Sequence, residues 1–93
     1  MIRVDFSNPV SFNQIAIFDG EVLEVFGLER SSRYHIAHIK SIEVNTDRKG
    51  NYSLKALNTS NNTIVMIMFD QADLPKVNEL VAEVKKAGDS FKL

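Results

Sequence analysis

Apolar and polar residues alternate along most of the chain up to Phe69. A period of two is typical of β-strands that bury one face. The pattern recurs in seven segments, which polar or glycine-containing turns separate. The seven predicted strands are residues 2–6, 14–18, 21–26, 32–36, 40–46, 52–57 and 63–69.

The turns between these segments have recognisable signals. Asp19-Gly20 stands between two β-forming runs and predicts a tight hairpin in which both residues have positive φ. The segments Asp47–Asn51 and Asn58–Asn62 consist mainly of polar residues that are common in turns, so we predict a turn at each. The strand 63–69 is the most apolar of the seven, so we expect it to lie at the centre of a sheet.

The period changes after residue 69. Six apolar residues then share one face of an α-helix: Leu74, Val77, Leu80, Val81, Val84 and Ala87. We predict this helix over 74–87, with Pro75 in its first turn and Gly88 as a left-handed stop. The helix must bury its apolar stripe against the strands, so the fold class is α+β.

Composition narrows the range of functions. The chain has 93 residues and is 44% hydrophobic, which suits one globular domain spanning 1–93. It has no Cys, which excludes disulfides, thiolate metal sites and a Cys nucleophile. The net charge of −1 gives no general attraction to nucleic acid, and the aromatic residues do not alternate with basic ones. We therefore expect no nucleic-acid partner.

The longest apolar run, Ile64–Phe69, is far shorter than a membrane-spanning helix. Polar residues also interrupt the N-terminal region where a secretory signal would stand. We expect a cytoplasmic protein with no transmembrane segment. No nucleotide-binding loop or hydrolase motif is present in the sequence, so we expect no cofactor and no catalytic activity.

Three segments resemble bacterial members of the pleckstrin-homology-like (PH-like) superfamily. They are the hairpin Ile15–Leu23, the corner Tyr34–Val44 and the closing helix 74–87. The resemblance covers about residues 14–88 and leaves the strand 2–6 without a fixed place. It implies a PH-like barrel of about seven antiparallel strands in two orthogonal sheets, closed by one C-terminal helix. It also implies binding of protein, peptide or lipid head groups.

The resemblance departs from the lipid-binding pattern at one place. Lipid-binding members have several Lys and Arg residues on the first hairpin turn. Here that turn contains Asp19 and Glu21, whose carboxylates would repel phosphate. This departure argues against phosphoinositide recognition.

Basic residues concentrate between positions 30 and 40. Arg30, Arg33 and Lys40 are candidates for an anion-binding patch, since Arg grips phosphate through two hydrogen bonds. The alternative is that they form the solvated face of a strand pair. His35 and His38 are the two histidines, and they are either a two-ligand metal site or surface residues.

Met66 and Met68 allow three interpretations. With Ile64, Val65 and Ile67 they form a soft ligand surface, or these residues pack in the core on both faces of a central strand. In the third interpretation, the methionines belong to an interface that a second subunit covers.

The leading hypothesis is a non-catalytic PH-like binding or scaffolding module for a protein or peptide partner, or for self-association. The partner would bind at an exposed strand edge, or in the groove between an edge strand and the helix. Ser32–Ile36 and the C-terminal helix are the candidate elements. One alternative is a lipid- or anion-binding module that uses residues 30–40, possible at a membrane surface. A further alternative is a small metal-dependent enzyme built on His35 and His38.

Overall fold

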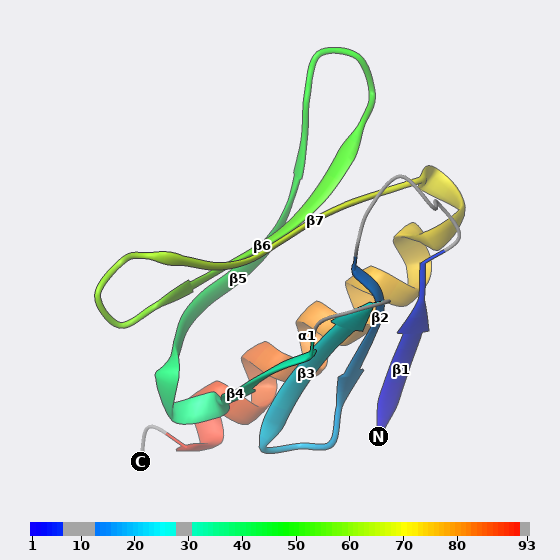
Figure 1. Cartoon of the computed structure of the whole chain (residues 1–93). Helices are drawn as coiled ribbons and strands as arrows, with labels where there is room; N and C mark the ends of the chain where they lie inside the picture. The colour runs from blue at the N-terminus through cyan, green and yellow to red at the C-terminus, as the bar shows by residue number, and fades with distance from the viewer. Residues whose placement is uncertain (7–12, 28–30, 92–93) are drawn as a thin grey trace.

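The computed structural model describes residues 1–6, 13–27 and 31–91 of the chain. These residues form seven β-strands, two short 3₁₀ helices and one C-terminal α-helix (Figure 1). The elements are β1 (Ile2–Asp5), β2 (Asn13–Phe18), β3 (Val22–Gly27), β4 (Ser31–His35), η1 (Ile36–His38), β5 (Ile39–Thr46), β6 (Tyr52–Asn58), β7 (Thr63–Phe69), η2 (Gln71–Asp73) and α1 (Leu74–Phe91).

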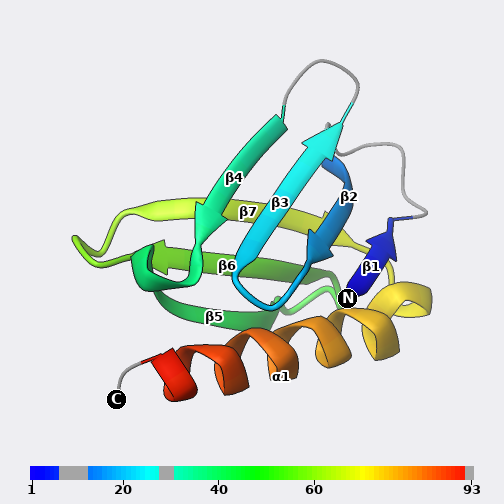
Figure 2. The same ribbon diagram turned by 90° about the horizontal axis from the view of Figure 1, so that it is seen from below.

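The strands form two antiparallel sheets. The first has the order β1-β2-β3-β4 and the second the order β5-β6-β7. In Figure 2 the strands of the first sheet cross those of the second, and α1 runs along the bottom of the view, below β5. Within the described residues, no strand of one sheet pairs with a strand of the other. The predicted α+β class, the seven strands and the single long helix are therefore confirmed.

The strand near the N-terminus takes the outermost place in the first sheet. β1 pairs antiparallel with β2, with Val4 opposite Ala16. Val4 is buried while Arg3 and Asp5 are exposed and form an ion pair of 3.0 Å. The alternation seen in the sequence thus gives this strand one face in the core and one in solvent.

The core lies between the two sheets and under α1. Every residue buried among the described ones is apolar, so packing of hydrocarbon side chains holds the layers together. The first sheet contributes Val4, Ala16, Phe18, Leu23 and Val25. The second contributes Ile39, Ile42, Leu54, Ala56, Val65, Ile67 and Phe69, and the helix contributes Val77, Leu80, Val81 and Val84. The predicted apolar stripe of the helix is the face that enters this core.

Two predictions about element positions are wrong. β7 lies at the edge of its sheet and not at the centre. β7 is strongly apolar because its inner face is buried and its outer face carries two methionines. Among the described residues, it does not have a strand partner on each side. The helix also continues past Gly88 to Phe91, because Gly88 has an ordinary helical φ and does not act as a left-handed stop.

The hairpin between β2 and β3 forms as predicted but with a different turn. Of the two residues Asp19 and Gly20, only Gly20 has a positive φ, of 108°. Instead, the Asp19 carboxylate accepts hydrogen bonds from the backbone amides of Glu21 and Val22, each at 2.8 Å. These hydrogen bonds, above all the one from Val22, lower the pKa of Asp19.

The two hairpin loops of the second sheet share one design. The Asp47 side chain accepts hydrogen bonds from the backbone amides two and four residues later, at 2.8 and 2.9 Å. The Asn58 side chain accepts the equivalent hydrogen bonds at 2.9 and 3.0 Å. The residue three positions on has positive φ in both loops: Gly50 at 79° and Asn61 at 65°. Glycine and asparagine tolerate this conformation best, so the predicted turns are confirmed with a common mechanism.

Truncation of a helix residue tests the packing of α1. Leu80 is fully buried in the core, so Leu80→Ala should lower the free energy of unfolding by about 2–5 kcal/mol. The control is Glu79→Ala, which changes an exposed neighbour and should stay within about 0.5 kcal/mol of the parent protein. Urea unfolding followed by circular dichroism measures both. Equal effects of the two substitutions would contradict this packing.

The Asp47 loop makes a pH-dependent prediction. Hydrogen bonds from the Asn51 amide and side chain hold the pKa of Asp47 below its ordinary value of 3.8. A lowered pKa stabilises the fold above pH 3.8, and this contribution disappears as the pH falls through the folded-state pKa. Asp47→Asn, which resembles the protonated side chain, should therefore be less stable than the parent at pH 7.

The stability difference between the parent and Asp47→Asn should shrink as the pH falls below 3.8. Urea midpoints measured along a pH series test this expectation. A difference that stays constant through the acid range would show that the Asp47 charge does not stabilise the loop.

Candidate binding groove between β5 and α1

A groove of 280 Å³ lies between the corner that leads into β5 and the C-terminal half of α1. We call it the β5–α1 groove. The corner and strand contribute Ile36, Ile39, Lys40, Ser41, Ile42 and Glu43, and the helix contributes Val84, Lys85, Gly88 and Asp89. The groove thus combines one strand of the second sheet with the helix that closes the core.

The short helix η1 positions the groove. It turns the chain from β4 in the first sheet to β5 in the second. The Ile36 amide donates to the Glu21 carbonyl at 2.7 Å, and the Ala37 amide donates to His35 Nδ1 at 3.0 Å. These two bonds fix the corner, so Ile36 is held against the core beside the helix.

Gly88 keeps the groove open on the helix side. Gly88 lies one helical turn after Val84, on the side of α1 that lines the groove. A Cβ built at Gly88 would lie 3.8 Å from Ile36 Cδ1, which is an ordinary van der Waals contact. A methyl group therefore fits here, whereas a large side chain would fill the space above Ile36.

The groove has an apolar floor and charged walls. The floor is made of Ile36, Ile39, Ile42 and Val84, which are buried from most of the solvent. The walls hold two cations, Lys40 and Lys85, and two anions, Glu43 and Asp89. Charges of both signs therefore line the groove in equal number.

β5 is an edge strand, since it pairs only with β6 in the described part of the chain. Its other side has no strand partner among the described residues and faces α1 across the groove. A strand edge without a strand partner is a site where an extended segment can add. A second hollow of 310 Å³ is lined by Gly20, Glu21, His35, Ile36, Ala87 and Ser90. Ile36 lines both hollows, and both include residues from the last turns of α1.

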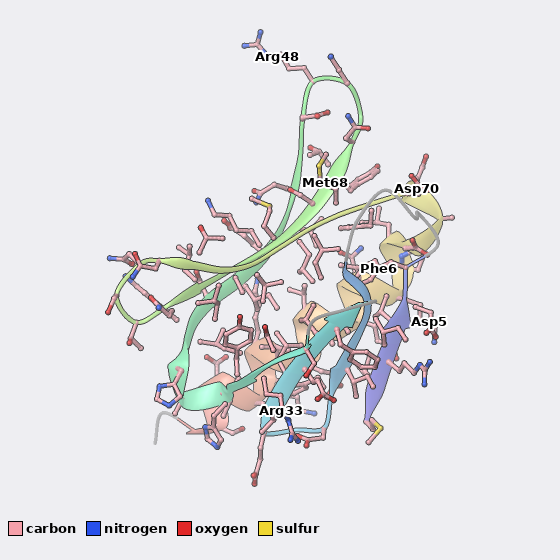
Figure 3. All side chains as sticks on the ribbon, viewed as in Figure 1. Asp5, Phe6, Arg33, Arg48, Met68 and Asp70 are labelled. Atoms are coloured by element: carbon pink, nitrogen blue, oxygen red, sulfur yellow. The ribbon has the colours of Figure 1, made fainter. Side chains whose placement is uncertain are left out.

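The three predicted anion-binding residues do not form one described cluster. Arg30 lies outside the described residues. Arg33 lies on β4 and pairs with Glu24 of β3 at 3.5 Å (Figure 3). Lys40, on the second sheet, donates a hydrogen bond to the Asn61 side chain in the β6–β7 loop. Arg33 and Lys40 thus belong to different sheets and have different partners.

The predicted binding elements, Ser32–Ile36 and the C-terminal helix, both contribute to these hollows through Ile36, His35 and the last turns of α1. Sequence reasoning missed the walls formed by Glu43, Lys85 and Asp89. The one signal in the sequence is Gly88, which falls four residues after Val84 in the apolar stripe. A glycine at that position indicates a helix stop as readily as a gap in the stripe.

His35 and His38 lie at the two ends of the corner. Their rings are 6.4 Å apart between centroids and meet edge to face. His35 Nδ1 accepts a hydrogen bond from the Ala37 amide, so this nitrogen is engaged within the corner itself. In the described residues, no group of three or more His, Cys, Asp or Glu side chains is placed to hold a metal ion.

The prediction that Met66 and Met68 lie in the core is wrong. Met66 is 50% exposed and Met68 is 54% exposed. Val65, Ile67 and Phe69 turn into the core instead, so the methionines occupy the outer face of the strand. A β-strand that is apolar on both faces cannot be assigned an inner face from its own sequence.

None of the helices in the described residues is both long and apolar enough to cross a membrane. Comparison of the sequence with protein-family models gives no match. Comparison with curated proteins also gives no match. The properties of the β5–α1 groove are therefore the basis for a functional assignment.

Proposed function

We propose that this chain is a non-catalytic PH-like module that binds an extended peptide or protein segment in the β5–α1 groove. The main observation behind the proposal is the position of the groove. It combines the side of β5 that no described strand pairs with, an apolar floor and charges of both signs. Each of these features matches one part of an extended peptide.

The order of the elements supports the PH-like part of the proposal. The chain forms a four-stranded sheet, then a three-stranded sheet and then one helix that packs against both. The resemblance implies the same order of elements. β1 pairs with β2 and is one of the seven strands, and we propose that it takes the position in the PH-like order that the resemblance leaves unassigned. We propose that the two sheets and α1 together make a PH-like barrel.

The chemistry of the groove favours a peptide. The main chain of a peptide would pair with the side of β5 that has no described strand partner, as in β-strand addition. An apolar side chain would enter the space above Gly88 and contact Ile36 and Val84. Lys85 and Asp89 on the helix would contact charged or polar groups that flank this anchor.

The same charges make a polyanionic ligand less suitable. In the groove, Glu43 and Asp89 offset Lys40 and Lys85. Outside it, Glu24 pairs with Arg33, and the first hairpin turn presents Asp19 and Glu21. A lipid- or anion-binding module that uses residues 30–40 is therefore the second-ranked function.

A pair of substitutions at Gly88 tests the groove. Gly88→Phe should fill the space above Ile36 and weaken peptide binding at least about tenfold, which corresponds to a loss of about 1.4 kcal/mol. Gly88→Ala should bind as the parent does and raise stability by about 0.5–1 kcal/mol, because alanine suits a helix interior better than glycine.

The probe is a peptide selected on the parent protein from a displayed random library and then titrated by fluorescence anisotropy. Circular dichroism and urea unfolding establish that both variants are folded. Equal affinity of the Gly88→Phe and Gly88→Ala variants would contradict binding in the groove.

Co-sedimentation with phosphatidylserine vesicles separates the two ranked functions. Binding that weakens with added salt and disappears in an Arg33→Gln/Lys40→Gln variant would favour the anion-binding function instead. The peptide module predicts that vesicles do not retain the protein at any salt concentration.

A further inference from the structure

The outer face of the three-stranded sheet has no cover within the described chain. It faces away from the first sheet and from α1 (Figure 1). Cross-strand register arranges its side chains in rows, and the two rows that contain the methionines are neighbours. One row is Glu43, Lys55 and Met66, and the other is Asn45, Ser53 and Met68. We call these six residues the methionine face.

The two methionines make this face unusual for a strand exposed to water. Apart from Met1, they are the large apolar side chains that are most exposed among the described residues. Figure 3 shows Met68 on the side of β7 that is turned away from the first sheet. Flexible, polarisable methionines side by side on a strand are typical of adaptable interaction surfaces.

We infer that the methionine face binds the same face of a second copy of this chain, so that two three-stranded sheets stack face to face. The two-fold axis would lie in the interface, perpendicular to the strands, between the two rows. Such an axis places each row of one copy over the other row of its partner. Stacked sheets pack about 10 Å apart, which leaves room for interdigitated methionines.

The side chains of the face are complementary to themselves under this symmetry. Met66 would lie over Met68 of the partner subunit, and each methionine would lose its contact with water. The Glu43 carboxylate would face an Asn45 amide, which is a hydrogen-bond donor. The Lys55 ammonium would face a Ser53 hydroxyl, which is an acceptor.

No like charges oppose each other in this arrangement. The single cation and the single anion of the face are already neighbours across β5 and β6. A partner of strong net charge would repel one of the two, whereas an identical copy meets each with an uncharged polar group. This complementarity is why we assign the face to a second copy and not to a charged partner.

The face is a separate surface from the β5–α1 groove. Of its six residues, only Glu43 also lines the groove. Gly88 lines the groove and is not part of the methionine face. Substitutions of the methionines therefore test self-association without altering the proposed peptide site.

Sedimentation equilibrium of the purified chain tests the inference. Its mass should rise from 10.5 kDa toward twice that value as the concentration increases to about 1 mM. A double substitution, Met66→Thr/Met68→Thr, retains β-forming residues on a solvent-exposed surface and should raise the dissociation constant at least about tenfold. A parent chain that stays at 10.5 kDa throughout this range would overturn the inference.

The matched control is Ile17→Thr, which removes an apolar side chain from the outer surface of the other sheet. It should leave the association unchanged. An equal loss of association in this control would overturn the assignment to the methionine face. Urea unfolding of both variants verifies that they remain folded.

Isotope-filtered NOE spectra of a mixture of labelled and unlabelled chains test the symmetry. They should show contacts between the Met66 methyl of one copy and the Met68 methyl of the other. A dimer whose intermolecular contacts exclude both methyl groups would overturn the proposed arrangement.

Discussion

The apolar stripe of α1 is the interaction on which the rest of this structure depends. Two small sheets, of four and three strands, leave one side of their shared core open along β1 and β5. Val77, Leu80 and Val84 close that side and are almost completely buried. Since no polar residue is buried among those described, no hydrogen-bond network can replace this packing.

The same helix also creates the candidate binding site. Val84, near the middle of α1, belongs to the core, and Gly88, one turn later, belongs to the groove. The helix continues past Val84 to Phe91, and its residues Lys85, Gly88 and Asp89 line the groove opposite β5. Stability and binding thus use consecutive turns of one element, which explains why the groove is preformed and why its floor is part of the core.

Sequence reasoning found the elements because each inner face has its own periodicity. Val4, Ala16 and Leu54 fall at strand positions, and Leu80 at a helix position, so local pattern and final burial agree. It failed at Met66 and Met68, which are apolar but exposed. It also failed at Gly88, where the glycine leaves space for the groove and does not end the helix. Exposure and free space depend on residues distant in sequence, so no local pattern reports them.

Native-state hydrogen exchange of the backbone amides tests the central role of α1 most directly. If the helix closes the core, the amides near Leu80 should exchange with a free energy within about 1 kcal/mol of the slowest amides of β6, since both would require global unfolding. Helix amides that exchange at a much lower free energy, while β6 remains protected, would show that the sheets hold together without α1. That result would contradict the role of α1 in both the fold and the groove.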